Sequence, residues 1–398
     1  YPANTGRMMI GDNPYLLFSR AAAPGSGNIE IRKITDDSLV DTLDVNSAAV
    51  SFADRRVYLL PHSPLVPGGY YVVVCNSCLQ DELGQPFDGF SDSGVFSFVV
   101  PTAIDIQADY DGDDYADVGI YYPITAEWYI QQSSTSYYAD PLMRRFGWNG
   151  AIPLSAGDYD GDGKVDIAIF DPLNARWYIQ YSSRAVDAEP YIRAFGWRGV
   201  TPISGGDYDG DGKTDIAIFD SVSATWYIQM SGSPAGSAPY IRRFGWRGVT
   251  PVAGDYDGDG KTDIAIFDSG SATWYIQKSS NASNSDPYIR RFGWGGVTPV
   301  NGGDYDGDGK SDIAIHDKVS GRWYVQFSTL PPSSAPRLYI LGGSGKVPVM
   351  RNDYDGDGRT DVVVFEPDSA SWLILYSSNE FIGTYTIRRF GWKGIIPL

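Results

Sequence analysis

Short apolar segments alternate with clusters of glycine, serine, asparagine and proline along most of this chain. In one stretch these segments are residues 264–267, 274–277, 287–294 and 297–300. The apolar residues do not follow the 3.6-residue spacing of an amphipathic helix over any length, and the segments are as short as β-strands. The pattern therefore predicts an all-β protein in which each group of four segments forms a four-stranded sheet.

Residues 1–100 follow a different pattern, without any copy of the later repeat. Turn signals such as Pro24-Gly25-Ser26-Gly27 and Pro67-Gly68-Gly69 separate seven apolar segments. Seven short strands in a segment of this length predict a β-sandwich. The predicted strands are residues 15–18, 29–34, 38–43, 48–52, 57–60, 70–74 and 95–100.

A nine-residue acidic motif, Asp-x-Asp-Gly-Asp-x-x-x-Asp, recurs through residues 101–398. Its six copies begin at Asp109, Asp158, Asp207, Asp255, Asp304 and Asp353, at intervals of 48 or 49 residues. Four strands in a repeat of this length are typical of a propeller blade, so residues 101–398 are predicted to form a six-bladed β-propeller. Residues 388–398 fall in register with the start of the first repeat and would close the ring. An open solenoid is the alternative, but it would need polar caps that we do not find.

The acidic motif has the spacing of a metal-binding loop. Carboxylates at positions 1, 3, 5 and 9 converge if the backbone turns sharply, and glycines at positions 4 and 6 permit that turn. With the carbonyl of position 7 they would form an all-oxygen shell, which suits calcium better than zinc, copper or magnesium. The alternative is a series of metal-free Asx turns, which would leave the carboxylates in mutual repulsion. The first copy departs from the pattern because Asp114 replaces the second glycine.

We predict about six calcium ions, one for each loop. The predicted ligands are Asp109, Asp111, Asp113, Tyr115 and Asp117; Asp158, Asp160, Asp162, Lys164 and Asp166; Asp207, Asp209, Asp211, Lys213 and Asp215; Asp255, Asp257, Asp259, Lys261 and Asp263; Asp304, Asp306, Asp308, Lys310 and Asp312; and Asp353, Asp355, Asp357, Arg359 and Asp361, where Tyr, Lys and Arg contribute only a carbonyl.

The net charge of −18 comes mainly from these loops. Four aspartates in each of six loops account for 24 of the 49 acidic residues, and six calcium ions would change the charge to about −6. An acidic chain of this kind is not expected to bind nucleic acid. No apolar run reaches 18 residues, so no transmembrane helix is predicted.

The predicted calcium sites and the cysteine pair bear on the location of the protein, inside or outside the cell. Extracellular calcium sites work at about 0.1–1 mM, so we expect a secreted or cell-surface protein, and a start at Tyr1 without Met is typical of a processed product. Cys75 and Cys78 form either a short local disulfide or free thiols. A zinc site would need His62 and His316 as well, and a thioredoxin-like role would need a βαβ unit.

The acidic loop and the Asp-Ile-Ala-Ile strand after it resemble the FG-GAP repeats, also described as VCBS-type, over residues 101–398. The Phe-Gly dipeptide is present at Phe146, Phe195, Phe244, Phe292 and Phe390. Such repeats form the propellers of integrin α chains, of certain fungal and bacterial lectins, and of domains attached to polysaccharide-degrading enzymes. The resemblance implies that the loop aspartates bind calcium and that these ions are mainly structural, away from the ligand face.

Residues 1–100 resemble the bacterial Ig-like domains of surface-layer and other cell-surface proteins. Four segments carry this resemblance, residues 2–6, 65–73, 81–87 and 95–98, and the cysteine pair is not part of the pattern.

Aromatic and basic residues of the repeat are the candidates for recognition. Six tryptophans lie in Trp-Tyr-Ile-Gln-type strands and are predicted to be core: Trp128, Trp177, Trp226, Trp274, Trp323 and Trp372. Five others follow Phe-Gly and are either sugar-stacking platforms or contacts between blades: Trp148, Trp197, Trp246, Trp294 and Trp392. Arg242 and Arg290, from Arg-Arg pairs, would bind an acidic sugar or pair with the loop carboxylates. The fifth repeat lacks both the Arg pair and this Trp.

No catalytic motif is recognisable, so we predict a non-enzymatic protein. The predicted function is calcium-stabilised binding or adhesion outside the cell, with a glycan or a cell-surface protein as the partner. The alternatives are a self-assembling subunit of a surface layer or filament, and an accessory domain of a polysaccharide-active enzyme.

Overall fold

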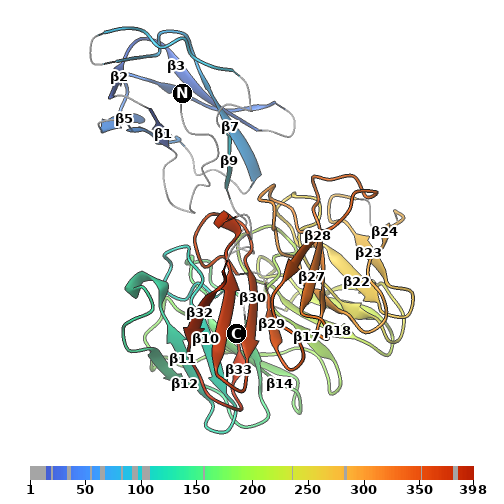
Figure 1. Cartoon of the computed structure of the whole chain (residues 1–398). Coiled ribbons are helices and arrows are strands. Elements are labelled where there is room, and N and C mark those ends of the chain that lie inside the picture. Colours follow the sequence, from blue (N-terminus) through green and yellow to red (C-terminus); the bar gives the residue numbers. More distant parts are fainter. Residues whose placement is uncertain are drawn as a thin grey trace. The chain divides into compact units, whose positions relative to one another are not determined.

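The computed structural model divides the chain into two compact units, Tyr1–Pro101 and Thr102–Leu398 (Figure 1). The structure describes residues 15–18, 21–33, 37–53, 56–62, 68–81, 84–91, 97–100, 108–155, 157–234, 236–281, 285–350, 352–379 and 384–398. Both units are built from short antiparallel strands. None of the helices in these ranges is long and apolar enough to cross a membrane.

The described residues of the first unit form three sheets. One has the order β4-β3-β7-β9, the second β1-β6-β5, and the third consists of β2 and β8. The strands are β1 (Tyr15–Leu17), β2 (Ala22–Pro24), β3 (Asn28–Lys33), β4 (Leu39–Asp44), β5 (Val50–Ala53), β6 (Arg56–Leu59), β7 (Gly68–Val74), β8 (Leu79–Asp81) and β9 (Ser97–Val100).

A single apolar core joins the sheets of this unit. Ile29, Ile31 and Val72 from the first sheet pack in one buried cluster with Val57 and Leu59 from the second. Ile29 and Ile31 flank the half-buried Glu30, and Val57 and Leu59 flank the half-buried Tyr58, which is the two-residue period of a strand with one face in the core. Each of the seven predicted strands overlaps an observed one, although residues 34, 95 and 96 lie outside the described residues.

The structure joins Cys75 to Cys78 by a disulfide, one of the two states that the sequence allowed. The sulfur atoms lie beside Gly27, whose φ is +121°. A Cβ at position 27 would lie only 2.5 Å from Cys75 Sγ, so glycine is required there.

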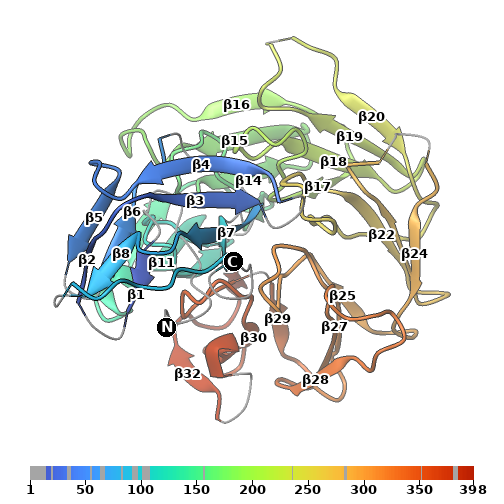
Figure 2. The same cartoon turned by 90° about the horizontal axis from the view of Figure 1, so that it is seen from above.

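The second unit contains six four-stranded antiparallel sheets within the described residues, a propeller-like arrangement of repeats (Figure 2). Sheet 1 contains β33 (Ile396–Pro397), β10 (Val118–Tyr122), β11 (Glu127–Gln131) and β12 (Leu142–Arg145). Sheet 2 contains β13 (Ile152–Leu154), β14 (Ile167–Asp171), β15 (Arg176–Gln180) and β16 (Tyr191–Ala194). Sheet 3 contains β17 (Thr201–Ile203), β18 (Ile216–Asp220), β19 (Thr225–Gln229) and β20 (Tyr240–Arg243).

The remaining sheets repeat the same order. Sheet 4 contains β21 (Thr250–Pro251), β22 (Ile264–Asp268), β23 (Thr273–Gln277) and β24 (Tyr288–Arg291). Sheet 5 contains β25 (Thr298–Val300), β26 (Ile313–Asp317), β27 (Arg322–Gln326) and β28 (Arg337–Ile340). Sheet 6 contains β29 (Val347–Val349), β30 (Val362–Glu366), β31 (Ser371–Leu375) and β32 (Thr386–Arg389). Two single-turn 3-10 helices, Ser133–Thr135 and Ser377–Asn379, follow β11 and β31.

The C-terminal strand completes the first sheet. Ile396 pairs with Tyr121, and Pro397 pairs with Ile120. Figure 1 shows β33 beside β10, although about 270 residues separate them along the chain. The C-terminal segment therefore lies beside β10 of the first repeat, as its register predicted.

The order of the strands gives each sheet two chemically different ends. The acidic loop joins the first strand to the second, and the connection from the third strand to the fourth lies at the same end. We call this the metal-loop end. The hairpin from the second strand to the third lies at the opposite end, together with the turn that carries the Phe-Gly-Trp sequence. We call it the tryptophan end.

The core of each sheet is centred on one tryptophan. Trp177 is fully buried and tilts against Phe170, its partner on the neighbouring strand, with ring centroids 5.5 Å apart. All six tryptophans predicted to be core have no exposed surface. In sheet 5 the partner of Trp323 is not phenylalanine but His316.

Candidate functional site

The backbone of each acidic loop turns around the aspartate at position 1. In the third loop, Asp207 Oδ1 accepts a hydrogen bond from the Gly210 amide at 2.6 Å, and Oδ2 accepts one from the Gly212 amide at 2.8 Å. These glycines have φ of +78° and +83°, which favours glycine. In the first loop Asp114 adopts the same left-handed conformation, with φ of +65°.

The aspartate at position 9 ties the loop to the next connection. Asp215 is buried, and its Oδ2 accepts a hydrogen bond from the Tyr208 amide at 2.7 Å. Its Oδ1 accepts one from the amide of Ser231, directly after β19, at 2.6 Å. The Ser231 hydroxyl also donates to both oxygens of Asp211, the position 5 aspartate, at 2.8 Å. The carboxylates of the loop thus hold two glycines, one tyrosine and one serine in place.

One carboxylate oxygen is left without a partner in every loop. This atom is Oδ1 of the position 3 aspartate, which is buried and has no hydrogen-bond partner among the described residues. It recurs in Asp111, Asp160, Asp209, Asp257, Asp306 and Asp355. A buried unpaired oxygen is costly, so its sixfold recurrence points to a ligand that this atom binds.

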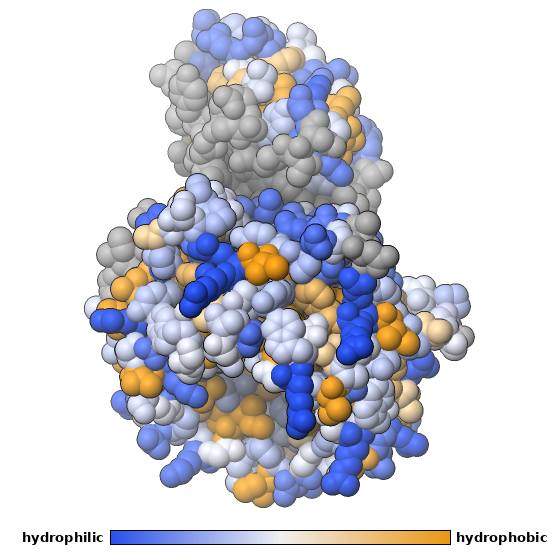
Figure 3. Space-filling view, turned by 90° about the vertical axis from the view of Figure 1, so that its right-hand side faces the viewer, coloured by the Kyte–Doolittle hydropathy of each residue, from blue (hydrophilic) through white to orange (hydrophobic). Residues whose placement is uncertain are grey.

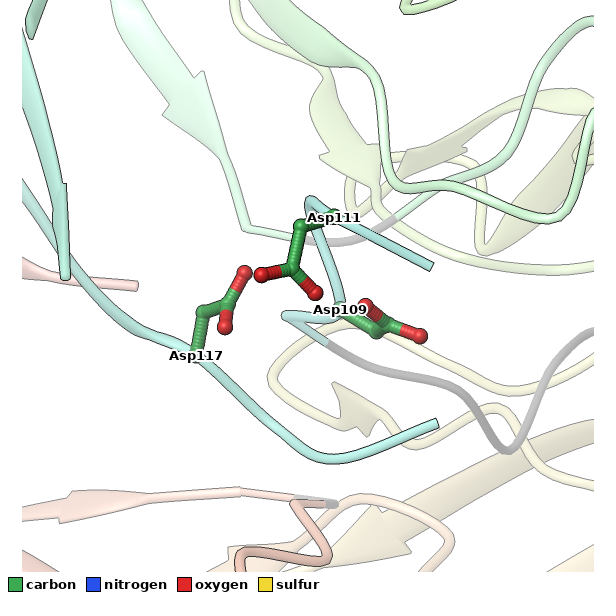
Figure 4. A group of neighbouring side chains, drawn as sticks. All are labelled: Asp109, Asp111 and Asp117. Atoms are coloured by element: carbon green, nitrogen blue, oxygen red, sulfur yellow. The ribbon is translucent and has the colours of Figure 1, made fainter. Parts of the chain in front are cut away.

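Other carboxylate oxygens lie close to this atom. In the first loop, oxygens of Asp109, Asp111 and Asp117 all lie within 4.8 Å of one another. Figure 4 shows the carboxylates of Asp111 and Asp117 pointing toward each other, with Asp109 beside them. The second and third loops have the equivalent group, and the fourth and fifth loops group the aspartates at positions 1, 3 and 5. A set of hard oxygen donors at this spacing fits a divalent cation.

The electrostatics of the loops also favour a cation. Burial, with repulsion from Asp209 and Asp207, raises the pKa of Asp215 to about 7. For the same reasons the pKa of Asp117 rises to about 7 and that of Asp109 to about 6. The charged forms of these side chains are therefore costly in this environment unless a positive charge offsets them.

The loops are linked to one another in a ring. The amide of position 8 donates to the position 1 carbonyl of the preceding loop at 2.6–2.7 Å in all six cases, including Ala116 of the first loop to Asp353 of the last. The position 7 side chain covers the position 4 glycine of the preceding loop, as Lys213 covers Gly161 and Tyr115 covers Gly356. Lys164 also donates to the Asp111 carbonyl at 2.9 Å. The carbonyls of position 7 remain predicted ligands.

The five tryptophans after Phe-Gly join neighbouring sheets at the tryptophan end. Each packs edge-to-face on a tyrosine of the next sheet, with centroids 4.9–5.1 Å apart and interplanar angles of 83–87°. The pairs are Trp148–Tyr178, Trp197–Tyr227, Trp246–Tyr275, Trp294–Tyr324 and Trp392–Tyr129. These tryptophans are still 37–42% exposed, so contact with a neighbour and contact with a ligand are compatible.

Arg242 and Arg290 also face a neighbouring sheet. Arg242 donates to Gln277, and Arg290 donates to Gln326, both at 3.3 Å. Arg193 makes the equivalent bond to Gln229 at 3.0 Å. No ion pair joins these three arginines to a loop carboxylate in the described parts of the chain, so one of the two roles predicted for Arg242 and Arg290 is not observed.

The junction between sheets 5 and 6 replaces all of these contacts together. Tyr339 and Leu375 stand where other junctions have arginine and glutamine, and Gly343 and Leu373 stand where they have tryptophan and tyrosine. All four side chains are replaced together at this junction. This indicates that the arginine, glutamine, tryptophan and tyrosine of the other junctions depend on one another. An ion pair between Lys346 and Glu366, with a 3.2 Å N–O distance, is present there instead.

A second set of arginines points outward, and sequence reasoning did not identify it. Arg243 and Arg291 are exposed on the outer strands of sheets 3 and 4. Sheets 2 and 5 have Ala194 and Ile340 there, but the residue paired with each across the strands is an arginine. One exposed guanidinium therefore recurs in every sheet, at the tryptophan end: Arg145, Arg176, Arg243, Arg291, Arg322 and Arg389. Figure 3 shows hydrophilic side chains protruding beside apolar patches on one side of the molecule.

Comparison with known proteins identifies the repeat. Residues 158–218, 207–266 and 255–315 match the FG-GAP-like repeat family. No curated protein matches the chain. Among solved structures, it is similar to a streptogramin B lyase, with 10% identity over 92% of this chain and 94% of the other and a TM-score of 0.40. It is also similar to a quinonprotein alcohol dehydrogenase-like protein from Bacteroides thetaiotaomicron, with 11% identity over 100% and 96% and a TM-score of 0.38.

Proposed function

We propose that each of the six acidic loops binds one calcium ion. The observation that carries this proposal is the position 3 Oδ1 atom, which is buried and unpaired in all six loops. The ligands would be the aspartates at positions 1, 3, 5 and 9 and the carbonyl of position 7. A bound calcium ion would supply the positive charge that the crowded carboxylates lack.

The same proposal includes the architecture. We propose that the second unit is a closed six-bladed propeller. Two observations support this: the hydrogen bonds between loops return from the sixth loop to the first, and β33 completes sheet 1. Closure leaves no sheet without a neighbour on either side. The first unit is an Ig-like sandwich, in keeping with its two larger sheets and shared core.

On this scaffold we propose non-enzymatic binding or adhesion outside the cell, with a glycan as the ligand. The tryptophan end supports a repeated recognition surface, since half-exposed rings such as Trp246 lie in the same sheets as outward arginines such as Arg243. Aromatic faces pack against the C–H surface of sugars, and guanidinium groups bind acidic substituents. Repetition around the ring would raise a weak single-site affinity.

A glycan array tests this function. The calcium-saturated chain is applied with and without chelator, beside the variants Trp246→Ala and Leu173→Ala. Leu173 is a suitable control because it is 69% exposed at the same end but has no aromatic face. Selective binding that Trp246→Ala weakens and Leu173→Ala leaves intact is the expected result. A blank array from folded, calcium-loaded protein would contradict glycan recognition, and light scattering with and without calcium would then test self-assembly.

A further inference from the structure

The described part of the second unit has a cleft between sheets 2 and 3, at the metal-loop end. Its volume is about 580 Å³. The walls come from the second acidic loop, the end of the third, and the connection after β19. This cleft is at the opposite end of the sheets from the tryptophans, so the repeated surface proposed above does not include it.

The equivalent space is filled at two other junctions. At the junction of sheets 6 and 1, Tyr137 is buried with its ring 3.8 Å from the Arg388 guanidinium. At the junction of sheets 4 and 5, the carbonyl of Pro332 accepts a hydrogen bond from Arg290. Tyr137 and Pro332 are each the fourth residue after the serine that follows the third strand.

The arginine at the 2–3 junction lines the cleft described above. Arg193 is the equivalent of Arg388 and Arg290, since each is the third residue of its outer strand. The chain itself shows what the space accommodates, because at the 6–1 junction a six-membered ring lies against the guanidinium. A ligand with a ring of similar size can occupy the same place over Arg193.

The cleft also has side chains that no other junction combines. Tyr181 and Tyr191 stack with centroids 5.9 Å apart at an angle of 23°, and the Arg184 guanidinium lies 4.9 Å from the Tyr181 ring. Tyr191 is 39% exposed and presents an aromatic surface at the rim. The residues equivalent to Arg184 in the other five sheets are uncharged: Thr135, Ser233, Asn281, Leu330 and Asn379.

The charges of the lining favour an anionic ligand. Three cationic side chains, Arg184, Arg193 and Lys213, face two carboxylates, Asp160 and Asp162. Both carboxylates belong to the second acidic loop, so calcium bound there would offset their charge. The hydroxyls of Ser183, Ser231 and Ser233 supply further polar groups for a ligand rich in hydroxyls.

We propose that this cleft binds one acidic sugar ring, a uronic acid residue of a polysaccharide, with its carboxylate toward the three cations. The ring would pack beside Tyr191, where an aromatic side chain meets the apolar face of a sugar. The inference rests on the proposed function in one respect, since calcium in the second loop is needed for full affinity. It adds a single-copy site to the repeated surface.

The test uses the full chain at saturating calcium and isothermal titration with a galacturonic acid trisaccharide. One trisaccharide per chain is the expected stoichiometry, and the neutral galactose trisaccharide should bind at least about tenfold more weakly, as expected for loss of a charge-assisted hydrogen bond. Arg184→Ala should weaken binding by a similar factor. Ser233→Trp should fill the cleft and abolish binding, whereas Thr135→Trp, the same change at the equivalent position of sheet 1, should not.

Several results would overturn the site. Equal binding of the neutral and acidic trisaccharides would exclude the charge recognition, and full binding by Ser233→Trp would exclude the cleft. Absence of galacturonic acid binding by a chain that binds calcium would contradict this inference while leaving the proposed function intact. Failure of calcium to bind, measured in a separate titration, would instead contradict the proposed function. Binding that Trp246→Ala removes and Arg184→Ala does not would assign the acidic sugar to the tryptophan end.

Discussion

Trp392 of sheet 6 packs edge-to-face on Tyr129 of sheet 1, with ring centroids 5.0 Å apart and an interplanar angle of 83°. The same contact joins four other pairs of neighbouring sheets. It is missing only between sheets 5 and 6 of the described chain, where tryptophan and tyrosine are replaced together by Gly343 and Leu373. The contact therefore couples the last sheet to the first in the same way as it couples internal neighbours.

A double-mutant cycle measures this coupling. Trp392→Ala and Tyr129→Leu should each destabilise the second unit, and the double variant should lose about 1 kcal/mol less than the sum, as aromatic pairs do. Urea unfolding at saturating calcium, followed by tryptophan fluorescence, is suitable because all eleven tryptophans lie in the second unit. Trp392→Ala with Tyr275→Leu, which are not in contact, serves as the control and should be additive within about 0.5 kcal/mol. Additivity for Trp392 and Tyr129 would mean that the contact contributes nothing.

The number of bound calcium ions tests the loops one at a time. Asp209→Asn removes the charge of the side chain whose Oδ1 is unpaired, so a calcium titration should give five sites in place of six. Asp220→Asn is the matched control, because Asp220 caps the hairpin turn after β18 through the Val222 amide and lies outside the loops. An unchanged count for Asp209→Asn would contradict our assignment of this side chain as a ligand.

Chelation should lower the melting temperature of the second unit clearly. Calcium at 100 times its Kd stabilises the folded state by about 2.7 kcal/mol for each independent site, and all of this is lost on removal. Magnesium should restore little, because it prefers strict octahedral geometry and retains its waters. An unchanged melting curve after verified metal removal would exclude a stabilising role for calcium.

One substitution in the first acidic loop should stabilise the protein. Asp114 has φ of +65° where the other five loops have glycine, and a left-handed conformation costs a residue with a side chain about 1 kcal/mol. Asp114→Gly should therefore stabilise the protein by about that amount in thermal unfolding, and Gly163→Asp should destabilise the second loop. Asp114→Asn separates the effect of charge from that of the backbone. A stability gain as large in Asp114→Asn as in Asp114→Gly would attribute the effect to charge.

The sequence predicted the features that depend on position within one repeat. Each copy of the repeat places Trp177 or its equivalent at the same point of an apolar strand, so burial follows from the pattern. The acidic loops are equally local, since nine consecutive residues determine them. The two strands that were not predicted, β2 and β8, have only three residues each and no alternation to detect.

Features that depend on contact between repeats were not predictable in this way. The strand register is needed to see that Ala194 pairs with Arg176. Only that register shows that every sheet keeps one exposed guanidinium. The Trp–Tyr contacts require knowledge of which sheets are neighbours. The cleft over Arg193 is lined by residues of two neighbouring sheets, so the sequence of one repeat does not reveal it.

His316 should make the stability of the second unit depend on pH. It occupies the position of phenylalanine or tyrosine in the other five sheets, is fully buried, and neither ring nitrogen has a hydrogen-bond partner among the described residues. Burial lowers the pKa of His316 to about 4, from 6.5 when exposed. Between these values the unfolded state binds more protons than the folded state, so stability rises with pH across this window and is lost as pH falls through it.

The change from pH 7.5 to pH 5 should therefore cost about 2 kcal/mol through His316 alone. His316→Phe should remove this loss, and should also stabilise the protein at pH 7.5 by about 1 kcal/mol or more, because two unpaired nitrogens are no longer buried. Urea unfolding of both proteins at both pH values, at saturating calcium, gives the comparison. Titration of the loop aspartates affects both proteins equally and cancels in the difference. His62→Ala, which removes an exposed histidine of the first unit, should keep the loss measured for the second unit. A loss of the same size in His316→Phe as in the parent chain would show that another group controls the pH dependence.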